Sequence, residues 1–240
     1  MPTKRVLFRN GDIRLVGELH LPADGSQCPG LVVCHGLASR KERHADFGSF
    51  AARHGIATLI FDARGHGESE GRLDGQSLSD VAAALQFLGE QPSVDATRLS
   101  IRGSSLGGHF ALHAAAELPA IKACVAVSPA PEGILAEGLA RMAAAFGTIP
   151  DPRVDLLDFQ NYLRSRNLSA TVGRIAPRPL LLIHCSGDEV IPSAVSSQLY
   201  AAAGEPKELW LLPGGSHTSA QHDTSVHQRT IAWLHRWLTP

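Results

Sequence analysis

The chain has 240 residues, of which 44% are hydrophobic, and its 22 Lys and Arg residues nearly balance its 23 Asp and Glu residues. A chain of this length can bury one large core, so we expect one domain. Neither sign of charge collects into a long run, which argues against nucleic acid or an anionic membrane as a partner.

The N-terminal residues lack the apolar stretch of a signal peptide, and no run is long enough to span a bilayer. We therefore expect a soluble, cytoplasmic protein. Residues 6–8 and 13–21 are typical of strands, and Asn10-Gly11-Asp12 between them accepts positive φ at low cost. The chain is expected to begin with an antiparallel hairpin.

From residue 30 onward, apolar strand patterns alternate with helical ones. Further strands are predicted at 30–34, 56–61, 98–104, 121–127, 180–184 and 208–212, and helices at 47–54, 78–88, 106–118, 193–203 and 222–238. Continuous apolar runs such as residues 30–34 indicate strands covered on both faces. The pattern predicts an α/β fold with a mostly parallel eight-stranded sheet and helices on both faces.

The segment from 130 to 177 is too long for a simple crossover between strands. It carries two apolar helical stripes on either side of Pro150-Asp151-Pro152: Leu135, Leu139, Met142 and Phe146, then Leu156, Phe159 and Leu163. We interpret it as a small helical cap, inserted after the sixth strand over the carboxyl edge of the sheet. Helices packed on the flank of the sheet are the alternative.

Residues 98–108 are typical of a strand, a very tight turn and a helix. Gly103, Ser105 and Gly107 match the G-x-S-x-G pattern of a nucleophile elbow, in which a strained turn presents the serine hydroxyl. Side chains at the two glycine positions would collide across so sharp a bend. The pattern alone is weak, and a Gly/Ser-rich turn stays open unless a base and an acid follow downstream.

The best candidate base is His217, in the flexible loop after the last strand. Histidine can accept the serine proton and return it to the leaving group. His222, His227 and His235 are of the same type, but we expect them to face the flank of the final helix or solvent.

The best candidate acid is Asp188, which follows the strand ending near His184. A carboxylate at this place would fix the tautomer of the His217 imidazole. An aspartate before a helix is also a common turn residue, and this alternative stays open. Glu189 is expected to face elsewhere, and Glu132 is the only serious substitute.

The order Ser105, Asp188, His217 is that of the α/β-hydrolase arrangement. Over its whole length the chain resembles the α/β-hydrolase superfamily, and among its members small bacterial carboxylesterases of the feruloyl and cinnamoyl esterase kind. The motifs that carry the resemblance are His35-Gly36-Leu37, Asp62-Ala63-Arg64-Gly65-His66-Gly67, Gly103-Ser104-Ser105-Leu106-Gly107-Gly108, Gly187-Asp188-Glu189-Val190-Ile191-Pro192 and Gly214-Gly215-Ser216-His217. The resemblance implies an oxyanion hole formed by the backbone amides of Leu37 and Leu106. It also implies a structural role for the loop containing His66.

The resemblance favours a serine hydrolase that cleaves a small carboxylic ester through an acyl-enzyme on Ser105. Thioesterase and aminopeptidase activity are alternatives, and a non-catalytic binding protein on the same fold is an alternative of another class. The expected partner is a small-molecule ester, and the oligomeric state stays open.

This chemistry needs no cofactor and no metal. His109 and His113 are four residues apart on a predicted helix, but no acidic partner is evident in the sequence, so we expect both to pack in the core. The four cysteines show no metal-ligand spacing and are expected to be buried as small apolar residues: Cys28, Cys34, Cys124 and Cys185.

Overall fold

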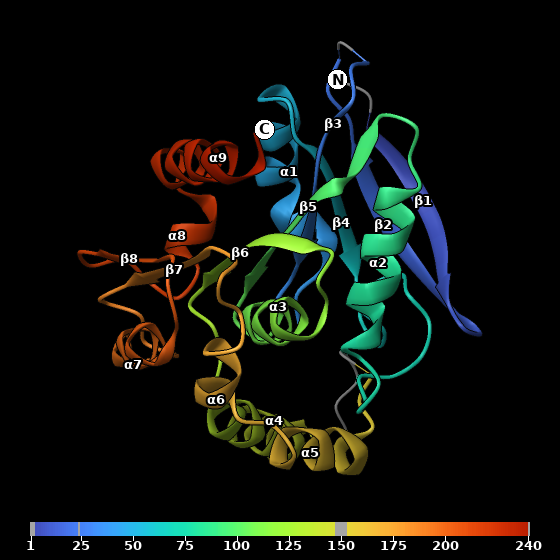
Figure 1. Ribbon diagram of the computed structural model, residues 1–240. Coiled ribbons are helices and arrows are strands. Elements are labelled where there is room, and N and C mark those ends of the chain that lie inside the picture. The colour runs from blue at the N-terminus through green and yellow to red at the C-terminus, as the bar shows by residue number, and fades with distance from the viewer. Residues whose placement is uncertain (1–2, 24, 147–152, 240) are drawn as a thin grey trace.

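A computed structural model describes residues 3–23, 25–146 and 153–239, apart from the side chains of 145 and 146. The described strands form one eight-stranded sheet in the order β1-β2-β4-β3-β5-β6-β7-β8 (Figure 1). They are β1 Thr3–Asn10, β2 Ile13–His20, β3 Cys28–Cys34, β4 Ala57–Asp62, β5 Val94–Ser104, β6 Ile121–Val127, β7 Leu180–Cys185 and β8 Lys207–Leu212.

Only the first hairpin departs from the parallel arrangement of the described strands. β1 pairs with β2, and β2 with β4, in antiparallel register, whereas every pair from β4 to β8 is parallel. Gly11 at the turn has a φ of 57°, the left-handed conformation that the Asn-Gly pair predicted. The predicted α/β fold and its sheet are confirmed.

Helices cover both faces of the sheet, as Figure 1 shows. The described helices are η1 Lys41–His44, α1 Ala45–Arg53, α2 Ser79–Gly89, α3 Leu106–Glu117, α4 Glu132–Phe146, α5 Leu156–Arg164, α6 Leu168–Val172, α7 Ala194–Ala202, α8 Ser219–His222 and α9 Thr224–Leu238. Leu31 and Val33 of β3 share a core with α1 and α9, and Val32 of the same strand shares the other core with α2 and α3. The continuous apolar runs therefore reflect burial on two sides.

The helix predicted over 222–238 is two helices in the structure. Its C-terminal part is α9, and the Asp223 side chain accepts hydrogen bonds from the backbone N–H groups of Ser225 and Val226. An aspartate in this position caps a helix N-terminus, so it starts a new helix there. The short helix α8 precedes it and follows directly on the loop that holds His217.

Helices α4, α5 and α6 follow β6 and lie together beyond α3 in Figure 1. They confirm a helical insertion after the sixth strand. Phe159 of α5 packs edge-to-face on Phe110 of α3, with ring centroids 6.4 Å apart. The Pro150-Asp151-Pro152 break and the Phe146 side chain lie outside the described residues.

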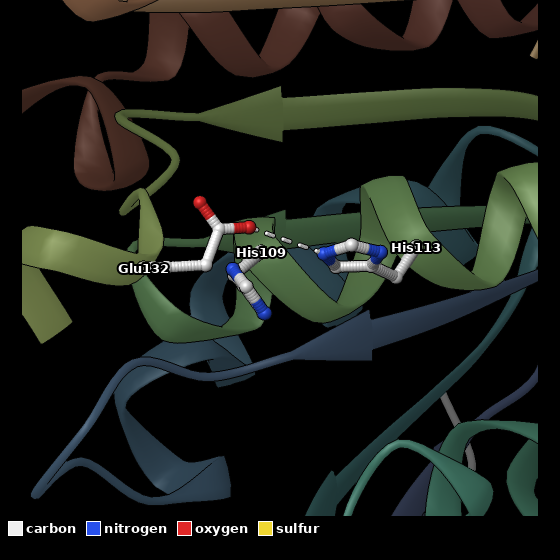
Figure 2. Close-up of side chains that lie close together, drawn as sticks. All are labelled: His109, His113 and Glu132. Carbon is white, nitrogen blue, oxygen red and sulfur yellow. Dashed lines mark ion pairs between the residues drawn. The ribbon is translucent and has the colours of Figure 1, made fainter. Parts of the chain in front are cut away.

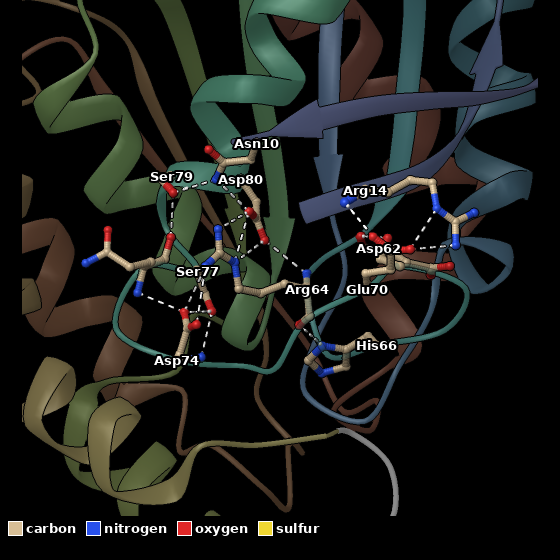
Figure 3. A network of polar contacts seen from close by, with 12 residues as sticks. Asn10, Arg14, Asp62, Arg64, His66, Glu70, Asp74, Ser77, Ser79 and Asp80 are labelled. Carbon is tan, nitrogen blue, oxygen red and sulfur yellow. Dashed lines mark hydrogen bonds and ion pairs between the residues drawn. The ribbon is translucent and has the colours of Figure 1, made fainter. Parts of the chain in front are cut away.

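A buried ion-pair network fixes the loop that follows β4 (Figure 3). The Arg64 guanidinium donates to both carboxylate oxygens of Asp80, which is fully buried, and also to Asp74. His66 in the same loop is fully buried and packs against the ring of His35. These contacts hold the loop rigidly beside the end of β3, in agreement with the structural role expected of it.

No helix in the described part of the chain is long and apolar enough to cross a membrane. The four cysteines are buried, as expected.

Candidate active site

Ser105 lies between β5 and α3 in a strained backbone conformation, with φ 56° and ψ −118°. This left-handed φ is costly for a residue that carries a Cβ atom. The neighbouring glycines make the turn sterically possible, since a Cβ on Gly103 would lie 1.9 Å from the Gly107 carbonyl oxygen. A Cβ on Gly107 would lie 2.1 Å from the Cys34 carbonyl oxygen. The turn has the geometry predicted for a nucleophile elbow.

Asp188 and His217 meet in the structure. His217 Nδ1 lies 2.8 Å from Asp188 Oδ2, and the Asp188 side chain is fully buried. The other carboxylate oxygen, Oδ1, accepts hydrogen bonds from the backbone N–H groups of Val190 and Ile191, both at 2.9 Å. Burial opposes ionisation of Asp188, but the Ile191 amide and His217 outweigh it and lower its pKa. Asp188 is therefore an anion whose carboxylate accepts a hydrogen bond from His217 Nδ1–H.

Hydrogen bonds between two loops hold this pair in place. Gly187 N–H donates to the Gly214 carbonyl at 3.0 Å, and Gly214 N–H donates to Ser186 Oγ at 2.9 Å. The Glu189 carboxylate, expected to face elsewhere, accepts the backbone N–H of His217 at 3.1 Å. It does not contact the imidazole, because it bonds the main chain instead. The two loops thus form one bonded unit.

Ser105 and His217 line the same pocket, of about 90 Å³, with Gly36 and Leu37 on its wall. Among the described residues, no hydrogen bond joins the Ser105 hydroxyl to the His217 ring. The His217 side chain is 15% exposed, and the loop before it contains Gly214 and Gly215 at φ 65° and 71°. Catalytic hydrogen bonds are often long without substrate and tighten in the reacting complex. His217 Nε2 has no hydrogen-bond partner in the described chain, and the residue lines the pocket beside Ser105.

Leu37 lines the pocket that contains Ser105, and Leu106 follows Ser105 at the start of α3. Within the described residues, neither N–H donates a hydrogen bond to another protein group. His35 fixes the peptide group that carries the Leu37 N–H. Its Nδ1 lies 2.8 Å from the Gly36 carbonyl oxygen, and its Nε2 accepts a hydrogen bond from Ala63 N–H at 3.1 Å. A carbonyl accepts only, so Nδ1 carries the proton. In the planar trans peptide that follows, the Leu37 N–H must point away from the His35 side.

The other candidate histidines lie elsewhere. His222 pairs with Asp46, His227 contacts Phe47, and His235 bonds the His54 carbonyl. These contacts agree with the expectation that all three face the flank of the final helix or solvent.

Glu132, the substitute acid, lies with the two histidines of α3 rather than with His217. Its Oε1 is 3.6 Å from His113 Nε2. The expectation that His109 and His113 have no acidic partner is therefore wrong, because α4 brings Glu132 onto α3 in the folded chain. Both rings are nevertheless fully buried, as expected.

Sequence reasoning missed a second histidine beside Asp188. His184 is fully buried at the end of β7, with Nε2 3.2 Å from Asp188 Oδ2 and 2.9 Å from the Ile191 carbonyl oxygen. Its Nδ1 lies 2.7 Å from Ser196 Oγ. Because the Ile191 carbonyl only accepts, Nε2 carries the proton and Nδ1 accepts from the serine. The sequence signal was a lone histidine at the end of an apolar strand.

Comparison with known proteins places this chain in a family. A family model described as serine aminopeptidase, S33, matches residues 26–171. The uncharacterized protein Rv2307c of Mycobacterium tuberculosis is 30% identical over 211 residues, which cover 87% of this chain and 70% of that protein.

Solved structures show the same fold. The α/β hydrolase GrgF from Penicillium superposes with a TM-score of 0.83 at 22% identity, covering 100% of both chains. Est1E from Butyrivibrio proteoclasticus, solved with ferulic acid bound, superposes with a TM-score of 0.81 at 21% identity, covering 98% of this chain and 100% of that one. The chain belongs to the serine aminopeptidase S33 family and has the α/β-hydrolase fold.

Proposed function

We propose that the protein is a serine hydrolase that cleaves a small carboxylic ester through an acyl-enzyme on Ser105. His217 Nε2 takes the hydroxyl proton as the Ser105 oxygen attacks the ester carbonyl, and a tetrahedral oxyanion forms. His217 then gives the proton to the leaving alcohol, and water repeats the sequence to release the acid. Asp188 holds the imidazole in the required tautomer and stabilises its charged form.

The observation that carries this proposal is the Asp188–His217 hydrogen bond of 2.8 Å on the wall of the pocket that contains the strained Ser105. A serine and a histidine that lay close together by chance would not be expected to have a buried carboxylate behind the imidazole. Nor would two backbone N–H groups without hydrogen-bond acceptors be expected near the serine. The Leu37 and Leu106 amides supply the donors for the oxyanion. Losing one such donor costs about 100- to 1,000-fold in rate.

The pocket favours a small acyl group. Its volume of about 90 Å³ is small beside the several hundred Å³ of pockets that hold larger ligands. The structural neighbour Est1E binds ferulic acid, which supports aromatic esters as a second class to test. Helices α4 to α6 supply no residue to this pocket in the described chain. We propose that the segment 130–177 acts as a cap within a single α/β-hydrolase domain.

Aminopeptidase activity is the second candidate, because the family description names it. An aminopeptidase needs a carboxylate near the serine to bind the substrate's amino terminus. Among the described residues that line the Ser105 pocket, none is acidic. We therefore rank aminopeptidase activity below ester hydrolysis. Thioester hydrolysis, which needs no carboxylate in the site, ranks between the two.

A substrate panel tests the proposal. Initial rates are measured for p-nitrophenyl acetate, methyl ferulate, a short acyl thioester and an aminoacyl p-nitroanilide, with Ser105→Ala as the background. We expect turnover of one or both esters that disappears in Ser105→Ala. Turnover of the aminoacyl amide alone would replace the esterase assignment, and no Ser105-dependent turnover would contradict hydrolysis.

A further inference from the structure

Two imidazoles and a carboxylate meet behind the nucleophile elbow, outside the pocket described above. His109 and His113 of α3 and Glu132 of α4 each present one ligand atom, and these atoms lie within 4.8 Å of one another (Figure 2). Both histidines are fully buried, and the Glu132 side chain is 20% exposed. None of the three lines the Ser105 pocket.

Two of the buried polar atoms in this cluster have no hydrogen-bond partner in the described chain: His113 Nε2 and Glu132 Oε1. Their separation of 3.6 Å is too long for a hydrogen bond. Buried polar atoms without partners cost free energy, so they call for an explanation. The imidazole nitrogen of His113 and the carboxylate oxygen of Glu132 point toward each other in Figure 2, as two ligands of one ion would.

The outer contacts of the histidines are those of metal ligands. His109 Nδ1 lies 3.2 Å from the Ala130 carbonyl oxygen, which only accepts, so Nδ1 carries the proton and Nε2 has the lone pair. His113 Nδ1 lies 3.2 Å from Thr171 Oγ1, which can accept a hydrogen bond from Nδ1–H in the same way. Ligating histidines almost always donate their second N–H to a carbonyl or another oxygen.

We propose that His109, His113 and Glu132 bind a zinc ion that fastens the helical cap to α3. Two imidazoles and one carboxylate are a common protein donor set for Zn²⁺, and water completes the tetrahedron. The Tyr162 hydroxyl of α5, 3.2 Å from His109 Nε2, would give up its hydrogen bond to that nitrogen and remain beside the ion. The role is structural, because the ion touches neither Ser105 nor His217.

The distances require a small contraction on binding. Donors at about 2.0–2.1 Å from a tetrahedral ion lie about 3.3 Å from each other. His113 Nε2 and Glu132 Oε1, at 3.6 Å, already approach this spacing, and the widest pair closes by about 1.5 Å. Glu132 also lines a surface pocket of about 200 Å³ between α4 and α5, through which an ion can enter.

Metal content tests the site independently of hydrolysis. The full chain is stripped with EDTA, dialysed against Zn²⁺ or Co²⁺, and analysed by elemental mass spectrometry, visible absorption and thermal unfolding. We expect one Zn²⁺ per chain, the intense visible bands of tetrahedral Co²⁺, and a Tm several degrees higher with Zn²⁺. Stoichiometric binding that leaves Tm unchanged would contradict the clamping of the cap.

Glu132→Gln keeps the shape of the side chain and removes its charge, and we expect at least tenfold weaker Zn²⁺ binding. The variant is compared with wild type in its circular dichroism before metal is added, so that misfolding is recognised. Glu132 is the partly exposed member of the cluster, so this change disturbs the core less than a change at either buried histidine.

His222→Gln is the matched control, because His222 and Asp46 form an exposed histidine–carboxylate pair at 2.9 Å. We expect it to bind Zn²⁺ as wild type does. Absence of stoichiometric zinc in wild type, or zinc retained in Glu132→Gln with unchanged affinity, would overturn the site. Loss of zinc in His222→Gln would show that the ion binds to His222 and Asp46 at the surface, and it would also overturn the proposed site.

Discussion

Replacing Asp188 by asparagine should abolish hydrolysis while leaving the fold in place. In the native site Oδ1 accepts two backbone N–H groups, from Val190 and Ile191, and Oδ2 faces His217 Nδ1 and the Nε2–H of His184. The asparagine carbonyl oxygen must take the Oδ1 position, because an NH₂ group there would oppose two donors. The NH₂ group then occupies the Oδ2 position and opposes only one donor, His184.

An NH₂ group in that position donates to His217 Nδ1, so the proton of the imidazole moves to Nε2. Nε2 then cannot accept the Ser105 proton. An aspartate-to-asparagine change that creates the wrong tautomer lowers kcat by about 10⁴-fold in a serine protease of the same triad chemistry. At about 1.36 kcal/mol per tenfold, this corresponds to roughly 5.4 kcal/mol of lost transition-state stabilisation.

The assay is kcat for p-nitrophenyl acetate at pH 7.5, with Ser105→Ala as the floor and Asp95→Asn, a surface carboxylate on β5, as the control. We expect the kcat of Asp188→Asn to lie within tenfold of the kcat of Ser105→Ala, and the kcat of Asp95→Asn to equal that of wild type. Urea unfolding should show a native-like cooperative transition. An Asp188→Asn protein that keeps a tenth or more of the wild-type kcat would refute the reasoning.

Three further changes test the parts of the site and the fold separately. His35→Gln should lower kcat by about 10- to 100-fold with KM unchanged, because the peptide that carries the Leu37 amide loses its support; an unchanged kcat in steady-state kinetics would contradict this. Gly107→Ala should destabilise the fold by about 3 kcal/mol or more in urea unfolding, since the new Cβ would lie 2.1 Å from the Cys34 carbonyl oxygen and neither backbone can move easily. Acid should destabilise the protein, because burial lowers the pKa of His66 to about 3 and the unfolded chain therefore binds its proton first. The stability that neutral His66 contributes is fully present above the ordinary histidine pKa. It is lost at about 1.4 kcal/mol per pH unit as the pH falls toward the pKa of His66 in the folded protein. His66→Phe should therefore flatten the dependence of the unfolding free energy on pH between pH 6 and 4, and an unchanged dependence would exclude His66 as the cause.

Local sterics explain why much of the site could be predicted. The elbow could be predicted because one of its steric constraints is local: a Cβ on Gly103 would lie 1.9 Å from the Gly107 carbonyl oxygen. The second glycine is required by the neighbouring strand β3, since a Cβ on Gly107 would lie 2.1 Å from the Cys34 carbonyl oxygen. Asp188 and His217 could be placed because both follow parallel strands, β7 and β8, whose carboxyl ends share one edge of the sheet. These inferences need only strand order and loop position.

Contacts between distant elements were beyond the sequence pattern. Glu132 meets His113 only because the first residue of α4 lies beside α3 in the folded chain, and no periodicity of the sequence records that contact. The bond between His184 and Asp188 depends on the path of the loop between them, which brings the carboxylate back against the end of its own strand. The break between α8 and α9 came from the Asp223 cap, which competed with a continuous apolar stripe and determined the helix start.

The most direct test of the account is to trap the nucleophile. The protein is incubated with a fluorophosphonate and digested, and the peptides are sequenced by mass spectrometry. Hydrolysis through Ser105 predicts a single stoichiometric adduct on that serine, absent in Ser105→Ala and formed far more slowly in His217→Ala. An adduct on another residue, or a Ser105 hydroxyl that never reacts in the folded protein, would contradict it.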